Sequence, residues 1–376
     1  MSELTFPATK LGSEFRLGIS EFSSFPYPMP KKIKVGFITN ADGAHVTAYL
    51  SALAATEACS EVVMADSDHK WDSTAKSSLK TKLTQTYGDY RQMLAREKPD
   101  MVIITLEART APPVIDAALD AGCHVFAEKP SCIRAEDFEP LAFKAESKHL
   151  NLMLALANRL NPEFQFAREL IQSGRIGKIY GVDMHLIADQ TRLTRKTYQD
   201  TWFADRKRAG GGHLIWLGIH WLDLAMHMTG SSISTVSGMT ANTGGQPINA
   251  EDSAVSTLRF ESGFLGTMTS GYYLDRRYHS GIKVWGSKGW LHLQQMLDSP
   301  LHWYENGGEH AGKVQEFTGS KNPRGYTPYV QAAVEACANE TEPPISVDDS
   351  LRALRTVFSI YKSAGTGKAV DVPSSN

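Results

Sequence analysis

The sequence predicts an α/β fold with two main domains: a doubly wound parallel sheet, then an α+β domain with a large, mainly antiparallel open sheet. The chain has 376 residues, enough for two domains of ordinary size. Up to about residue 157, Val/Ile-rich runs alternate with segments of helical periodicity, which is typical of parallel strands joined by crossover helices. Further along, strand-like stretches follow one another with few helices between them, which favours an antiparallel sheet. We therefore expect an N-terminal arm at 1–30, a first domain at 31–157 and a second at 158–376, whose last helix and tail could pack back on the first.

The expected elements of the first domain alternate along the chain. The arm before them contains Pro7, Pro26, Pro28 and Pro30 and has little periodicity. Buried strands are expected at 33–38, 61–65, 101–106, 124–127 and 151–155. Helices are expected at 44–55, 90–96, 112–121 and 135–147.

The second domain has a different texture. A helix at 162–173 leads into a strand at 180–187, and a run of three glycines at 210–212 precedes a long amphipathic helix at 214–228. Further strands are expected at 235–239, 254–260, 264–273, 281–285 and 290–294. Helices at 329–338 and 350–364 complete the chain.

Composition and charge exclude several classes of protein. Charged residues make up 21% of the chain and the formal net charge is −2, so nothing favours a nucleic-acid partner. The apolar runs are far shorter than the ~20 residues of a membrane span, and the start of the chain lacks the apolar block of a secretory signal. The four cysteines form no C-x-x-C pair, and His213, His220 and His227 stand seven residues apart, each step roughly 10 Å along one helix, too far for one ion. We expect a cytoplasmic protein with no metal, no membrane and no nucleic-acid partner.

The turn after the first strand is a candidate site for a dinucleotide. A strand, a glycine turn and a helix can place backbone N–H groups against a pyrophosphate. Here the three glycine positions of G-x-G-x-x-G hold Thr39, Ala41 and Ala44, with Asn40 between the first two, so an ordinary βα turn is the alternative. Asp66 ends the next strand, about 20 residues on, where an acid can accept hydrogen bonds from the adenosine ribose. That acid would repel a 2′-phosphate, so NAD is favoured over NADP; the alternative role for Asp66 is a helix N-cap.

One segment carries a family resemblance. Residues 122–130 read Gly-Cys-His-Val-Phe-Ala-Glu-Lys-Pro, which resembles the A-G-x-H-V-x-x-E-K-P motif of the Gfo/Idh/MocA oxidoreductases. Later segments that resemble the family are 158–162 (Asn-Arg-Leu-Asn-Pro), 174–179, the glycine run with the G-x-H-x-x-D of 218–223, 286–289 and 363–370. The resemblance covers roughly 33–372. It implies an N-terminal Rossmann domain, a C-terminal α/β domain whose open sheet often forms a dimer or tetramer face, and a nicotinamide held between them.

The resemblance also implies roles for two residues. The lysine of E-K-P is Lys129 and the histidine of G-x-H-x-x-D is His220, and in the family these act on the substrate hydroxyl. Oxidation of a carbinol needs a base for the hydroxyl proton and a cation beside the developing alkoxide. Lys129 follows a buried strand at the edge where such folds bind ligands, and burial would lower its pKa. Glu128 could hold the lysine or face the nicotinamide, and Asp223 lies three residues from His220, close enough to orient it.

The chain departs from the family pattern in two places. The usual aspartate four residues before the histidine is Trp216, and the usual T-P-N-x-x-H after the fourth strand begins Thr105-Leu106-Glu107. Trp216 could stack on a sugar ring or be a core residue. Trp202 and Arg206 precede the glycine run on a segment that could cover the cleft. Aromatic and basic residues also gather at 272–279, where they could bind a sugar or an acidic substituent, or form a solvated hairpin.

These observations predict an NAD-dependent oxidoreductase acting on a hydroxyl of a sugar, polyol or glycoside. Lys129 and His220 are the expected catalytic residues. The expected cofactor contacts are Thr39, Asn40, Ala41, Asp66, Thr105, Glu128 and Lys129, and the expected substrate contacts are Lys129, Trp202, Arg206, Trp216, His220 and Asp223. A redox-neutral enzyme that cleaves or eliminates through a transient 3-keto sugar is an alternative, motivated by Trp216. A non-catalytic nucleotide or sugar sensor is another, motivated by the missing glycines. We expect a homodimer or homotetramer formed through the C-terminal sheet.

Overall fold

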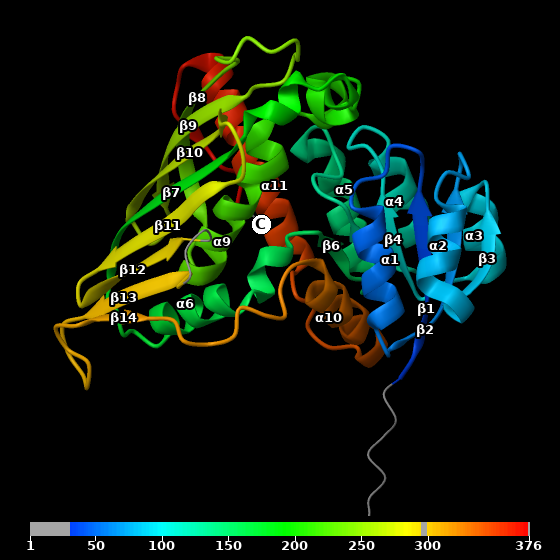
Figure 1. Cartoon of the computed structure of the whole chain (residues 1–376), viewed down its shortest axis with the longest axis horizontal. Helices are drawn as coiled ribbons and strands as arrows, with labels where there is room; N and C mark the ends of the chain where they lie inside the picture. Colours follow the sequence, from blue (N-terminus) through cyan, green and yellow to red (C-terminus); the bar gives the residue numbers. More distant parts are fainter. Residues whose placement is uncertain (1–30, 295–298, 375–376) are drawn as a thin grey trace, which may run out of the picture. The chain divides into compact units, whose positions relative to one another are not determined.

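The fold is built on two β-sheets with helices between and around them. The computed structural model describes residues 31–294 and 299–374, and the arm expected at 1–30 lies outside the described residues. In Figure 1 the six-stranded sheet and the nine-stranded sheet are seen with α9, α11 and α6 between them. The sequence prediction of a parallel Rossmann sheet followed by a large, mainly antiparallel sheet is confirmed.

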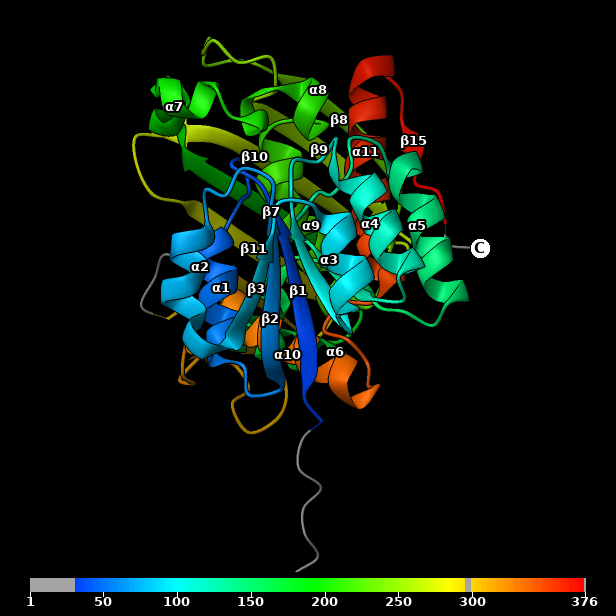
Figure 2. The same cartoon turned by 90° about the vertical axis from the view of Figure 1, so that its right-hand side faces the viewer.

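The first sheet is parallel throughout, with the strand order β3-β2-β1-β4-β5-β6. The strands are β1 (Ile33–Thr39), β2 (Cys59–Asp66), β3 (Leu83–Tyr87), β4 (Met101–Thr105), β5 (His124–Ala127) and β6 (Leu152–Leu154). The helices are α1 (Val46–Ala55), α2 (Asp72–Leu79), α3 (Tyr90–Glu97), α4 (Ala111–Asp120) and α5 (Ala135–Ser147). Figure 2 shows α1 and α2 on one side of the strands and α3, α4 and α5 on the other. Helices on both faces explain why β4 and β5 are almost uniformly apolar.

Two local contacts position helix α3 against the first sheet. Asp89 accepts a hydrogen bond from the Arg91 N–H and so caps α3. Gly36 in β1 lies so close to α3 that an added Cβ would stand 2.8 Å from a methyl of Val102 and 3.0 Å from Met93. Because β1, β4 and β5 are parallel neighbours, their carboxyl ends meet at one edge of the sheet, where ligands of such sheets bind.

The second sheet has nine strands in the order β14-β13-β12-β11-β7-β10-β9-β8-β15, and only the β7–β10 pair is parallel among the described residues. The strands are β7 (Ile179–Asp189), β8 (Ile233–Ala241), β9 (Ser253–Phe260), β10 (Leu265–Leu274), β11 (His279–Gly286), β12 (Gly289–Gln294), β13 (Leu301–Glu305), β14 (Val314–Glu316) and β15 (Val370–Asp371). β9 alternates buried and exposed positions, as expected of a sheet covered on one face.

Helices of the second half cover one face of this sheet. They are α6 (Pro162–Gln172), α9 (Ile219–Thr229) and α11 (Val347–Thr366), which contact β12, β7 and β8 respectively. The other helices of this half are α10 (Tyr326–Asn339) and the short α7 (Lys196–Gln199) and α8 (Arg206–Ala209). α11 contacts β8 and α9 and also contacts α5 and β6 of the first sheet, while α10 contacts α1. Ser346 caps α11 by accepting from the Asp349 N–H, and Gly367 ends it in the left-handed region.

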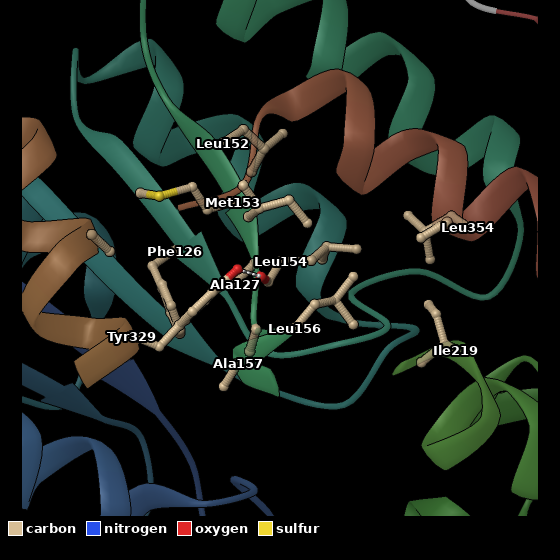
Figure 3. Close-up of a cluster of buried hydrophobic side chains, with 14 of the residues drawn as sticks. Phe126, Ala127, Leu152, Met153, Leu154, Leu156, Ala157, Ile219, Tyr329 and Leu354 are labelled. Atoms are coloured by element: carbon tan, nitrogen blue, oxygen red, sulfur yellow. Dashed lines mark hydrogen bonds between the residues drawn. The ribbon is translucent and has the colours of Figure 1, made fainter. Parts of the chain in front are cut away.

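A continuous core joins the two sheets through these helices. Figure 3 shows Phe126 and Leu154 of the first sheet beside Tyr329 of α10, with Ile219 of α9 and Leu354 of α11 nearby. The Tyr329 hydroxyl donates to the Leu154 carbonyl over 3.0 Å, so the one polar atom of this ring has a partner. The helix α9, which carries His220, contacts the segment Ala157–Leu160 that directly follows the edge strand β6.

Several elements were not predicted. β3 reads Leu-Thr-Gln-Thr-Tyr and lies at the sheet edge, so it lacks the apolar run of the central strands. The short β13 and β14 and helix α2 were also missed. The helix expected at 214–228 begins with a π-helical turn over Leu214–Gly218, before the regular α9. No helix of the described ranges is both long and apolar enough to cross a bilayer.

Candidate active site

Lys129 is a buried amine at the end of β5. Only 1% of the residue is exposed, and its Nζ donates to the Trp216 carbonyl over 2.8 Å. The same Nζ stands 3.0 Å from the centroid of the Trp216 indole and 3.9 Å from Oε1 of Glu128. Burial lowers the pKa of Lys129 to about 7, against the opposing effect of the Glu128 charge. An amine with this pKa can accept or release a proton near neutral pH.

His220 lies on α9 next to this amine. The residue is 9% exposed, and its Nδ1 is buried without a hydrogen-bond partner among the described residues. Burial lowers the pKa of His220 well below its usual value, and the charges of Lys129 and His45 lower it further. The imidazole is therefore neutral, with a ring nitrogen free for a ligand. The structure brings together the two residues expected to be catalytic.

A buried carboxylate network supports Lys129, and sequence reasoning missed most of it. Glu128 is 1% exposed, and its Oε2 accepts from the hydroxyl of Tyr49 and from Nδ1–H of His45 over 2.8 Å. Burial acts to raise the pKa of Glu128, but His45, Lys129 and Tyr49 outweigh it and hold that pKa below its usual value. Because a carboxylate only accepts, Nδ1 of His45 carries a proton. The only signal in the sequence was a histidine in the turn after the first strand.

His45 also defines the wall of a cavity. Its side chain is 34% exposed and its ring is parallel to the Trp216 indole, 5.8 Å between centroids. The cavity measures about 460 Å³ and is lined by Ala41, Asp42, Gly43, Ala44, His45, Lys70, Trp71, Arg192, Tyr198, Thr201, Trp202, Phe203 and Trp216. Trp216 thus separates the open cavity from Lys129, which lies behind the indole.

The turn after β1 is tightly built. An added Cβ on Gly43 would stand 2.1 Å from Oγ1 of Thr39 and 3.0 Å from the Thr105 carbonyl, so this glycine is required for the close approach. Thr39 donates to the Thr105 carbonyl over 3.3 Å, and Thr105 donates to the Ala44 carbonyl over 2.5 Å. The two threonines therefore join the ends of β1 and β4 and shape the turn from behind.

The amides of this turn bear on its fit to a pyrophosphate. The Ala41 N–H donates to Oδ2 of Asp68 over 2.8 Å, and the Asp42 N–H donates to the Asn40 side chain over 3.0 Å. The next amides, of Ala44 and His45, have no acceptor among residues 31–294 and 299–374. They lie just before α1, where a helix N-terminus favours an anion. The turn therefore fits the phosphates of a dinucleotide, chiefly through its second half.

The carboxylate of Asp66 binds backbone amides of its own segment, and it is not the N-cap of α2, which is Trp71. The residue is fully buried, and its two oxygens accept from the backbone N–H of Asp68 over 3.1 Å and of Trp71 over 2.7 Å. Asp66 thus holds the segment that leads into α2. The acid exposed beside the Ala41 amide is Asp68, two residues later.

Trp202 and Trp216, both expected to bind the substrate, contact each other, whereas Arg206 lies at a different place. Trp202 is fully buried, donates from Nε1 to the Asp42 carbonyl over 3.2 Å, and meets Trp216 edge-on at 5.3 Å between centroids. Arg206 is exposed and lines a separate surface hollow with Arg134 and Tyr361, so its expected place in the substrate site is corrected.

Asp223 also requires a correction. It is 1% exposed, and both of its oxygens are taken by Arg159, with Nε at 2.9 Å and Nη2 at 2.5 Å. Arg159 also donates to Asp349 over 2.7 Å. The carboxylate is therefore committed to the junction of α9, α11 and the short helix η2 (Ala157–Leu160) that follows β6. It neither orients His220 nor faces the cavity.

A buried acid behind the glycine run also escaped the sequence reasoning. Both oxygens of Glu251 accept backbone N–H groups, from Gly212 over 2.5 Å and from Leu214 over 3.0 Å, and Tyr361 donates to it over 2.7 Å. An added Cβ on Gly212 would stand 2.0 Å from the Glu251 carbonyl. The glycine run therefore allows close approach to Glu251, which fixes the start of the segment that carries Trp216 and His220. Within the described part of the chain, no group of three or more His, Cys, Asp or Glu could hold a metal ion.

Comparison with known proteins agrees with this architecture. Residues 34–156 match the model of the oxidoreductase family with an NAD-binding Rossmann fold, and residues 164–292 match the GFO/IDH/MocA C-terminal domain. Myo-inositol 2-dehydrogenase of Thermotoga maritima is 22% identical over 312 residues, which cover 82% of this chain and 90% of that protein. D-glucoside 3-dehydrogenase of Escherichia coli is 27% identical over 319 residues, covering 77% and 86%.

A solved structure shows the same fold over most of the chain. Levoglucosan dehydrogenase in complex with NADH and levoglucosan matches with a TM-score of 0.81 and 18% identity, and the match covers 92% of this chain and all of that one. The resemblance inferred from the Glu-Lys-Pro and G-x-H-x-x-D segments is thus confirmed by both domain models. The chain belongs to the Gfo/Idh/MocA family of NAD-binding oxidoreductases.

Proposed function

We propose that this protein is an NAD-dependent oxidoreductase that transfers a hydride between the nicotinamide and a hydroxyl or keto carbon of a sugar, polyol or glycoside. The observation that supports it most is the pairing of a buried amine, Lys129, with a neutral imidazole, His220. Two relatives, a myo-inositol 2-dehydrogenase and a D-glucoside 3-dehydrogenase, act by name on carbinols of the same kind. The test is reduction of NAD across a panel of sugars, polyols and glycosides.

The residues that would hold the cofactor lie around the turn after β1. The free amides of Ala44 and His45 would face the phosphates, and the acid side chains of Asp66 and Asp68 stand where a 2′-phosphate would be repelled, which favours NAD over NADP. Thr39 and Thr105 would contribute to cofactor binding by shaping the turn. Glu128 would contribute by stabilising the charged form of Lys129. When bound, NAD supplies the hydride acceptor.

Lys129 and His220 share the work on the alcohol. In the oxidation direction the neutral amine of Lys129 takes the hydroxyl proton and becomes an ammonium beside the developing keto oxygen. The carboxylate of Glu128, 3.9 Å away, stabilises that ammonium. The neutral His220 offers a ring nitrogen to the same oxygen. The indole of Trp216 must leave the face of Lys129 for the alcohol to enter.

The pKa of Lys129 gives a pH prediction for both directions. Oxidation needs the neutral amine, so kcat/KM for the alcohol should rise as pH increases through about 7 and level off above it. Reduction of the ketone needs the ammonium, so its kcat/KM should fall over the same range. The titratable groups near this amine are Glu128, 3.9 Å away, and His220, on whose pKa the Lys129 charge acts. Parallel profiles in the two directions would contradict the role of Lys129.

The redox-neutral alternative is favoured by one arrangement. Elimination through a keto sugar needs a second acid–base group for the carbon-bound proton and the leaving group, and His45, backed by Glu128, lines the cavity. Release of a cleaved product without net accumulation of reduced cofactor would favour this alternative over simple dehydrogenation.

We further propose that the protein forms a homodimer or homotetramer through the outer face of the nine-stranded sheet. Leu265 and Trp285 flank Gly181 on that face and are 55% and 44% exposed, beside an open hollow of about 700 Å³. Leu265→Arg should lower the mass in light scattering to that of a monomer, since it buries a charge in the interface. Phe143→Arg, on the exposed side of α5, is the matched control and should leave the mass unchanged. A monomeric wild type would contradict the proposal.

A further inference from the structure

Arg192 enters the cavity from a well-anchored turn. It lies in the turn Gln190–Thr194 that follows β7. Asp189 fixes this turn by accepting from the Thr191 N–H over 2.7 Å and from its hydroxyl over 2.6 Å, and Leu193 is buried beneath it. The position of Arg192 is therefore set by the backbone rather than by an ion pair.

Tyrosine rings frame the guanidinium. Its carbon lies 5.4 Å from the ring centroid of Tyr272 and 5.6 Å from that of Tyr278, and Nη2 donates to the Tyr278 hydroxyl over 3.2 Å. Tyr272 in turn shares a hydrogen bond of 3.0 Å with the hydroxyl of Tyr198. The rings hold the charge in place while using only one of its five N–H groups for a direct hydrogen bond among the described residues.

This half-buried cation has no carboxylate within 4.0 Å in the described ranges. Asp189, the nearby acid, is bonded to Thr191. By contrast, Arg208 on the same side of the molecule is paired with Glu107 and Asp42, and Asp42 is the only acid that lines the cavity. A partly desolvated guanidinium with free donors on a cavity wall is suited to an anion.

The aromatic wall of the cavity suits a sugar ring, while the turn at 41–45 that lines the same cavity is the proposed place of the cofactor phosphates. Trp202, Phe203 and Trp216 form an aromatic cluster, with centroids of Phe203 and Trp216 4.2 Å apart, and all three line the same space of about 460 Å³ as Arg192. Aromatic walls with one or a few fixed polar groups are typical of sites for small organic ligands. Trp216 also contacts Lys129, so the aromatic surface links the cation to the proposed reacting centre.

We infer that the substrate is a sugar that carries an anionic group, a carboxylate or a phosphate, and that Arg192 binds this group. The inference rests on the proposed function and narrows its substrate class. From the sequence, the aromatic and basic residues at 272–279 could bind a sugar or an acidic substituent. Tyr272 and Tyr278 of this segment contact Arg192, which comes from another part of the chain and supplies the proposed anion-binding group.

Binding measurements test the inference without requiring turnover. Calorimetric titration of the NAD-loaded protein would compare hexuronates and hexose 6-phosphates with their neutral hexoses in the gluco, galacto and manno series. At least one acidic sugar should bind about 10- to 100-fold more tightly than its neutral partner, as expected for charge-assisted hydrogen bonds. The uronate and phosphate arms decide between the two anions. If no acidic sugar binds more tightly than its neutral partner, the inference is overturned.

Variants of Arg192 separate recognition from structure. Arg192→Met should remove the preference for the acidic sugar and its dependence on salt concentration, while the affinity for the neutral sugar stays within about twofold; Arg192→Lys should keep part of both. Arg195→Met, an exposed arginine on the next turn, is the control and should bind as the wild type does. A wild-type preference in Arg192→Met overturns the inference. Arg192-dependent binding without hydride transfer on any sugar would instead refute the proposed function and leave the anion site standing.

Discussion

Replacing Lys129 by methionine is expected to lower the rate constant of hydride transfer by about 10²- to 10⁴-fold, the usual contribution of a general acid–base group. The side chain is buried, so no water can take over its position beside the substrate oxygen. Methionine has a similar length and no charge, and its burial in this apolar setting costs less than burial of an amine. Glu128 would lose its ion pair with Lys129 but keep its hydrogen bonds to His45 and Tyr49, so the variant should remain folded.

The controls distinguish chemistry from folding. Lys76→Met changes an exposed lysine on α2 and should leave both rate and stability unchanged. His220→Ala should also lose turnover, since its unpartnered ring nitrogen is the second group proposed to face the alcohol. Full activity in both Lys129→Met and His220→Ala would remove the two residues from the mechanism.

Replacing Asp223 by alanine should lower the free energy of unfolding by about 3–5 kcal/mol, the range for breaking a buried ion pair. Arg159 would keep Asp349 as a partner but lose both hydrogen bonds to Asp223, and it is only 3% exposed. The loss follows from an uncompensated buried charge and not from the substrate site. Chemical denaturation followed by circular dichroism measures it.

A second variant checks this reason. Asp275→Ala removes an exposed acid that pairs with Arg276 at the surface, and it should change stability by less than about 1 kcal/mol. An Asp223→Ala protein with wild-type stability and a raised KM would instead place this carboxylate in the substrate site, as the sequence had suggested.

The sequence predicted those parts of the molecule whose signals are local. β4 and β5 are continuous apolar runs because helices cover both faces, and Lys129 stood out because a Glu-Lys-Pro segment follows such a strand. The edge strand β3 has no such run, because one side of its ladder has no neighbour. Asp66 was ambiguous for a local reason too: the backbone amides of Asp68 and Trp71 compete with any ligand for its oxygens.

The remaining site residues depend on contacts between distant parts of the chain. His45 forms a hydrogen bond with Glu128 and stacks on Trp216. Arg192 packs against the rings of Tyr272 and Tyr278. Neither pairing has a spacing that periodicity could detect. The same holds for Asp223, whose helical position beside His220 was correct but whose partner, Arg159, is 64 residues away in sequence.

Rapid mixing of the NAD-loaded protein with acidic and neutral sugars, followed by the absorbance of the reduced nicotinamide, tests the central claim most directly. The account predicts that reduced nicotinamide forms within a single turnover, more slowly when the reacting carbon carries deuterium, and that Lys129→Met abolishes the signal. Tight binding of NAD and sugar with no reduced nicotinamide in any mixture would contradict it, and would leave a protein that binds both without transferring a hydride.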